Sequence, residues 1–104
     1  DLPKAVRGRD SKRIGILLAH QPKSIFEAAD HDIDLVLSGH THGGQLWPFR
    51  FAVRLVQPYI EGLHLHNDRT RIFVHRGTGY WGIPMRLAVD AEVVELILKR
   101  PLQV

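Results

Sequence analysis

The sequence predicts an α/β fold that begins as a β–α–β unit and ends in antiparallel strands. Residues 14–19 and 34–38 are short, nearly continuous apolar runs, which are typical of strands buried on both faces. Residues 62–66 and 71–75 instead alternate apolar and polar side chains on either side of a turn at Asn67-Asp68. This second pattern predicts an antiparallel hairpin.

The first half of the chain carries clear boundary signals between its elements. Pro22 ends the first apolar run because proline cannot donate to a sheet ladder, and Gly39 ends the second run. Between them, Ser24 and Glu27 have the spacing of a capping box, so we expect a short helix over residues 25–29. A strand, a helix and a strand in close succession predict two parallel strands joined by a right-handed crossover.

The second half is expected to consist of strands and loops. Residues 45–47 suggest a short strand, and residues 48–58 suggest a long loop. Residues 77–84 form a glycine-rich stretch that predicts another loop. Residues 85–89 and 92–98 are apolar enough to close the chain as two more strands.

Composition and charge exclude several classes of protein. Residues 1–13 hold five basic side chains and are expected to form a connector, with residues 14–104 belonging to one domain. The net charge of +3 permits an anionic partner, but the basic arm holds no aromatic residue, so nucleic-acid binding is not predicted. The absence of cysteine excludes disulfides and thiolate metal sites. No apolar run approaches the ~20 residues that a membrane-spanning helix needs.

Seven histidines are the one compositional anomaly, and three of them stand at informative positions. His20 follows the first predicted strand, while His40 and His42 follow the second. Ligands collect beyond the carboxyl ends of parallel strands, so these three imidazoles are expected to converge at one edge of the sheet. Imidazole is a ligand for zinc, manganese and iron, which predicts a metal site. The alternative is a set of hydrogen-bonded histidines in a loop.

These residues carry a resemblance to a known family. Leu-Ala-His-Gln-Pro at residues 18–22, followed by Gly-His-Thr-His-Gly-Gly-Gln at residues 39–45, resembles the closing half of the calcineurin-like metallophosphoesterase superfamily. The second motif is similar to that of a bacterial branch whose members often carry a membrane anchor or export signal. The likeness extends over roughly residues 14–98 and includes the terminal stretches around residues 76–79 and 82–87.

The resemblance implies a fold and a mechanism for the intact protein. The fold would be a two-sheet α/β/β/α sandwich, of which this chain supplies the C-terminal half. His20 and His40 would ligate one of two divalent ions (Mn, Fe, Zn or Ca), and His42 would ligate the other. The intact enzyme would hydrolyse phosphate monoesters or diesters through a metal-bridging hydroxide, and it could be associated with a membrane.

The chain also departs from the family pattern. The family's first three motifs, Asp-x-His, Gly-Asp and Gly-Asn-His, do not occur in it. We therefore expect an N-terminal half upstream of Asp1 to supply the remaining ligands and the catalytic residues, and we assign no catalytic residue here. The fragment alone is expected to be inactive and to self-associate through the sheet face that lacks its partner.

Other residues leave alternatives open. Arg76 and Arg86 flank the glycine-rich loop and are candidates for binding phosphate oxygens of the substrate, with surface charge as the simpler interpretation. The aromatic side chains of residues 47–59 and 80–81 could pack the loops, wall a substrate cleft or form a membrane-facing patch. His64 and His66 are expected to face solvent. The alternative function is a non-catalytic β-rich binding module whose metal is structural or absent.

Overall fold

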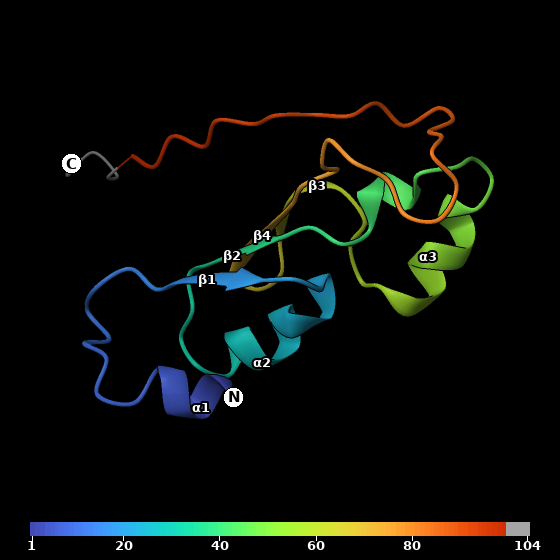
Figure 1. The fold of residues 1–104 in the computed structure, drawn as a ribbon. Helices are drawn as coiled ribbons and strands as arrows, with labels where there is room; N and C mark the ends of the chain where they lie inside the picture. The colour runs from blue at the N-terminus through green and yellow to red at the C-terminus, as the bar shows by residue number, and fades with distance from the viewer. Residues whose placement is uncertain (100–104) are drawn as a thin grey trace.

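The computed structural model describes residues 1–99 and shows one four-stranded sheet with short helices (Figure 1). The elements in chain order are α1 Leu2–Ala5, β1 Ile16–Ala19, the 3₁₀ turn η1 Pro22–Ser24, α2 Ile25–Ala29, β2 Leu35–Ser38, the 3₁₀ turn η2 His42–Gly44, α3 Arg50–Val56, β3 Gly62–Leu65 and β4 Arg71–Val74. None of the helices in residues 1–99 is long and apolar enough to cross a bilayer.

The sheet has the strand order β1-β2-β4-β3. β1 pairs with β2 in parallel and β2 pairs with β4 in parallel, whereas β3 and β4 form an antiparallel pair. The predicted β–α–β unit and the predicted hairpin are therefore both confirmed, as is the α/β fold class. Three parallel strands consequently end at the same edge of the sheet, which is where His20 and His40 lie.

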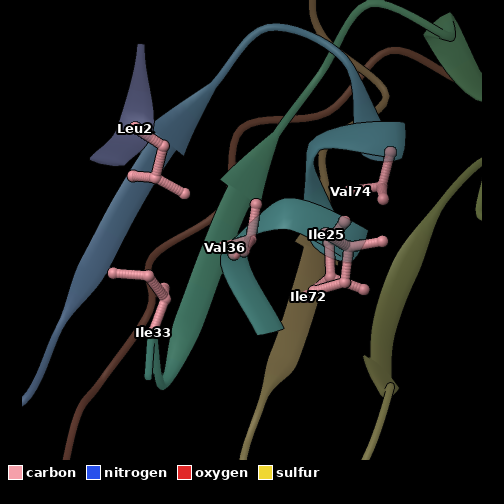
Figure 2. Packing of buried hydrophobic residues seen from close by; sticks show 7 residues of the cluster. Leu2, Ile25, Ile33, Val36, Ile72 and Val74 are labelled. Carbon is pink, nitrogen blue, oxygen red and sulfur yellow. The ribbon is translucent and has the colours of Figure 1, made fainter. Parts of the chain in front are cut away.

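The hydrophobic core lies between one face of the sheet and the helices α1 and α2. Ile25 of α2, Val36 of β2 and the β4 residues Ile72 and Val74 are completely buried, and Leu2 of α1 joins them (Figure 2). Residues 1–13, which we expected to form a connector, thus place an apolar side chain in this core. Arg9 in the same segment also donates a hydrogen bond to the Asp32 carbonyl at 2.8 Å.

The opposite face of the sheet is apolar and largely uncovered. The exposed fractions are 78% for Leu18, 62% for Leu63 and 60% for Leu65. The pairing register aligns Leu18 with Leu37 and Phe73, and Phe73 with Leu63, so one apolar row runs across all four strands. This is the exposed apolar face that the sequence predicts for a chain lacking a second sheet.

Residues 48–58 were expected to be a loop, and this prediction is wrong because they contain α3. Four of its seven residues are good helix formers, namely two arginines, an alanine and a leucine. It ends at Gln57, whose backbone is extended (φ −122°, ψ 132°). Pro58 accounts for this end, because a residue that precedes proline is sterically driven out of the helical region.

The two last predicted strands, residues 85–89 and 92–98, do not form, and the short strand at residues 45–47 is reduced to one bridge between Leu46 and Leu87. Residues 90–99 are extended and run along the sheet on the side opposite α1 and α2 (Figure 1). There Leu96 and Ile97 line a shallow cavity together with sheet residues. An apolar run of this kind predicts extended backbone, but a β-strand also needs a sheet edge with which its backbone can pair.

Two local predictions also fail. Ser24 makes no side-chain capping bond at the start of α2, because η1 already leads into the helix. His64 of β3 and His66, the residue that follows β3, are half-buried while the leucines of β3 are exposed, since both imidazoles contact Tyr59. The Tyr59 hydroxyl lies 3.1 Å from His66 Nδ1, and the His64 ring stacks on the Tyr59 ring.

Candidate functional site

His20 and His40 lie beside each other at the carboxyl edge of the parallel strands. His20 directly follows β1, and His40 stands two residues after β2. The Ser38 hydroxyl donates to the His20 carbonyl at 3.1 Å, and the Gly39 amide donates to the same oxygen, which ties the two strand ends together. The His20 and His40 rings have centroids 4.5 Å apart. The prediction that these two imidazoles converge at one edge of the sheet is therefore confirmed.

The environment of His40 favours a neutral imidazole. Partial burial is the largest cause that lowers the pKa of His40, and the nearby His20 and Lys23 lower it further. A neutral imidazole presents a free lone pair, which is the form that ligates metals. The lowered pKa of His40 thus matches the metal-binding chemistry that the sequence predicts.

His42 lines the same edge but faces a different neighbour. Its side chain is half-buried, and its Nδ1 atom lies 3.3 Å from the Arg86 guanidinium. Burial and then the Arg86 charge lower the pKa of His42, while a hydrogen bond with the Gly79 backbone opposes them. His42 is therefore also held neutral, although its ring is not stacked on the His20 and His40 pair.

The backbone that carries these histidines is strained. His40 has φ of 69° and His42 has φ of 49°, both in the left-handed region that side chains other than glycine rarely adopt. Such strain costs on the order of 1 kcal/mol or more per residue, and it concentrates at functional sites. Two strained histidines separated by a single residue are consequently a stronger functional signal than the His-x-His spacing alone.

Gln45 fixes the conformation of this loop. The side chain is almost completely buried, and its amide nitrogen donates to the Trp81 carbonyl at 2.8 Å. Its amide oxygen accepts the Trp81 backbone N–H at 2.7 Å. Gln45 therefore joins the histidine loop to the glycine-rich loop, a role that we did not assign from the sequence. Its position directly after Gly43-Gly44 in the family motif was the available signal.

The three histidines open onto one cavity of about 560 Å³. The remaining wall is mainly apolar and comes from α3 and from Trp81; its residues include Phe49, Ala52, Val53, Val56 and Trp81. Sequence reasoning missed this wall because it did not predict α3. The cavity combines a row of imidazoles with an apolar side, a combination that is typical of small-molecule sites.

The donor set fits divalent transition metals in kind but is incomplete in number. Neutral imidazoles suit zinc, manganese and iron. However, residues 1–99 contain no group of three or more histidine, aspartate or glutamate side chains close enough together to hold an ion. The His20 and His40 pair therefore fits a divalent metal only as part of a larger ligand set.

Neither candidate phosphate-binding arginine lines the cavity. Arg76 forms an ion pair with Glu92 at 2.8 Å. Arg86 donates to the carbonyls of Arg76 at 2.7 Å and Gly79 at 2.6 Å, and so braces the glycine-rich loop. These contacts give both side chains structural partners, and their binding of phosphate stays a prediction.

Comparison with known proteins identifies relatives over almost the whole chain. The sequence is 52% identical over 99 residues to an uncharacterized metallophosphoesterase of Helicobacter pylori, an alignment that covers 94% of this chain and 27% of that protein. It is 44% identical over 102 residues (96% of this chain) to a transmembrane protein with a metallophosphoesterase domain of Danio rerio. The protein of the same description from Bos taurus is 46% identical over 101 residues (95% of this chain).

The last two alignments each cover 23% of the relative. No family model matches the chain, and no solved structure matches it. This chain spans about a quarter of the length of the curated relatives it matches. The alignments cover 94% and 96% of this chain at 52% and 44% identity, and on these grounds the chain belongs to the metallophosphoesterases.

Proposed function

We propose that this chain supplies the C-terminal part of the active site of a divalent-metal-dependent phosphoesterase, which hydrolyses phosphate monoesters or diesters. The observation that carries the proposal is the convergence of His20, His40 and His42 on one cavity at the carboxyl edge of three parallel strands. The relatives are named as metallophosphoesterases, which supports the reaction class.

Each histidine would have a defined place in the intact enzyme. His20 and His40 would hold one divalent ion, and His42 would hold a second. Divalent ions in such a site activate water and stabilise the charge that develops on a phosphate ester. The ions would be manganese, iron, zinc or calcium, with imidazole donors favouring the first three.

The chain's own residues prepare the site for this chemistry. The lowered pKa values of His40 and His42 keep both imidazoles unprotonated at neutral pH. Val53 and Trp81 line the apolar side of the cavity. Gln45 holds the histidine loop against the glycine-rich loop through its two hydrogen bonds with Trp81.

The remaining ligands would come from an N-terminal half of the same protein. The described residues bring no carboxylate into the histidine cluster, and carboxylates would offset the charge of two divalent ions. The chain alone is therefore expected to bind metal weakly and to have no hydrolase activity. Sequencing the DNA upstream of the Asp1 codon tests this point. An open reading frame that encodes Asp-x-His, Gly-Asp and Gly-Asn-His would support the proposal, and a start codon directly before Asp1 would contradict it.

The reaction is tested in the protein that includes the upstream part. Hydrolysis of p-nitrophenyl phosphate and bis(p-nitrophenyl) phosphate is measured with and without manganese. The His40→Ala substitution should lower the metal-dependent rate at least about 100-fold, because it removes a ligand and not merely a supporting group. His31→Ala is the matched control, since His31 lies at the end of α2, away from the cavity, and contacts the Glu27 carbonyl. Near-normal activity of the His40 variant would refute the assignment and favour a non-catalytic binding module.

The uncovered sheet face predicts a second property of the isolated chain. In the intact protein this face would pack on the N-terminal half, and without that half a second copy of the chain would cover it. Sedimentation of the 104-residue chain should therefore show self-association at high concentration. Leu18→Glu should abolish it, because Leu18 is 78% exposed on this face. A monomer at every concentration would contradict the proposal.

A further inference from the structure

α3 is an apolar helix with no buried side chain. Five of its seven residues are apolar, yet none is buried within the described chain. Leu55 is 87% exposed, Val56 is 72% exposed and Phe51 is 55% exposed. Water contact on this scale is unfavourable for apolar side chains, so the helix has a face that is built to be covered.

The loops on either side of α3 extend this face. Trp47 is 56% exposed, and Tyr80 of the glycine-rich loop is 57% exposed. The rings of Phe49 and Trp81 contact each other with centroids 5.5 Å apart, which joins the two loops. Trp47, Phe49, Phe51, Leu55, Tyr80 and Trp81 are hereafter called the aromatic surface.

The charges of the aromatic surface have a single sign. Residues 45–60 contain two arginines and no acidic residue, and residues 77–89 contain one arginine and no acidic residue. Arg50 is paired with Glu61, whereas Arg54 is exposed on α3 and has no ion pair within residues 1–99. Exposed tryptophan and tyrosine together with unpaired arginine are typical of surfaces that lie in the headgroup region of an anionic bilayer.

The aromatic surface is continuous with the histidine cavity. Phe49 and Trp81 belong to both, because they line the cavity and are also 45% and 42% exposed. A membrane that covered the aromatic surface would therefore lie at the mouth of the cavity. Membrane proximity is also consistent with the vertebrate relatives, which are named as transmembrane proteins.

We propose that the aromatic surface docks on an anionic lipid bilayer, with α3 lying in the interface and the histidine cavity opening towards the lipid headgroups. The inference goes beyond the proposed function and does not depend on it, since docking needs neither metal nor hydrolysis. If both hold, the favoured substrates are phosphate esters borne by lipids, which reach the cavity along the membrane surface.

Binding of the 104-residue chain to vesicles tests the proposal without metal. The vesicles contain phosphatidylcholine and phosphatidylglycerol in equal parts, and bound protein is measured by co-sedimentation. Leu55→Glu should lower the partition coefficient at least about tenfold, because it removes a leucine that would be buried in the lipid interface. Val93→Glu is the matched control, since Val93 is 87% exposed, as Leu55 is, and it lies outside the aromatic surface. Circular dichroism of both variants verifies that they are folded.

Arg54 gives an independent test of the charge argument. Arg54→Gln should lower binding to the anionic vesicles about fivefold and leave the weak binding to pure phosphatidylcholine unchanged. Arg7→Gln, an exposed arginine of the N-terminal segment, should change neither. Equal losses for Leu55→Glu and Val93→Glu, or no vesicle binding at all, would overturn the proposal. It would also be overturned if Leu55→Glu kept vesicle binding but lost binding to the upstream part of the protein, which would assign the aromatic surface to a protein partner.

Discussion

Gly44→Ala should be one of the most destabilising small substitutions in the chain. Gly44 has φ of +85°, and a Cβ atom placed on it would lie 2.2 Å from Arg50 Cβ and 2.5 Å from Arg50 Cα. The left-handed conformation alone costs an alanine about 1 kcal/mol. The collision adds about 1–3 kcal/mol, because the atoms that must move are at the start of α3 and not at the end of a flexible side chain. We expect a total loss of about 2–4 kcal/mol.

Two other glycines separate the conformational part of this cost from the collision. Gly8 and Gly82 also have positive φ (77° and 67°), but a Cβ atom on either would meet nothing within 4 Å. Gly8→Ala and Gly82→Ala should therefore lose only about 1 kcal/mol. Urea unfolding measures all three variants, and the comparison holds if the midpoint shifts while the slope with urea concentration stays constant. A Gly44 variant that is as stable as the Gly82 variant would refute the packing argument.

The Gly44→Ala substitution should also alter the candidate site. Arg50 begins α3, and α3 supplies Val53 and Val56 to the wall of the histidine cavity. Displacing its first turn should therefore distort both the cavity wall and the aromatic surface. In the vesicle assay, the Gly44 variant should bind more weakly than the Gly82 variant even under conditions in which both are folded.

Three further predictions concern the site and its support. His40→Asn should leave the stability of the chain unchanged or raise it by up to about 1 kcal/mol, because asparagine tolerates the left-handed backbone better than histidine does. A loss of stability greater than about 1 kcal/mol in thermal unfolding would contradict the argument that His40 is strained at φ 69°. The lowered pKa values of His40 and His42 mean that the unfolded chain binds more protons below about pH 6.5, so stability should be constant above this pH and should fall as the pH drops through the folded-state values. Urea midpoints across this pH range measure the effect. A rise in stability on acidification would contradict the predicted fall. Glu92→Gln should cost about 1 kcal/mol at neutral pH, because the hydrogen bond from Arg76 is what most lowers the pKa of Glu92. That stabilisation is present above about pH 4.5 and is lost below it, so the variant and the parent chain should converge in acid, and a difference that persists there would contradict the charge argument.

The elements that could be predicted from the sequence are those whose signals are local. The apolar run before Pro22 and the run before Gly39 became β1 and β2, and the Asn67-Asp68 turn joined a hairpin. The predictions that failed concern elements whose formation depends on the rest of the fold. Residues 92–98 have the composition of a strand, but no sheet edge pairs with them, and the availability of an edge depends on the whole fold. α3 was missed because its apolar residues show no single buried face.

The candidate site divides in the same way, into contacts that local signals predict and contacts that depend on residues distant in the sequence. Strand order follows from the β–α–β rule, so the juxtaposition of His20 and His40 could be inferred without any structure. The orientation of His42 could not, because it depends on the contact with Arg86, which lies far along the chain. Gln45 joins two loops in the same way, through bonds between residues distant in sequence.

The strained loop after β2 shows why the site and the fold make different demands on this sequence. His40, His42 and Gln45 all have positive φ, and glycine would adopt each of these conformations at lower cost. Gly43 and Gly44 in the same segment show that glycine is used here where close packing requires it. An imidazole at a left-handed position therefore lowers stability in return for a side chain that a glycine lacks. Because the two strained histidines open onto one cavity, this strain agrees with the proposal that their side chains act as ligands there. The stability of the loop and its chemistry should then respond oppositely to substitution at His40.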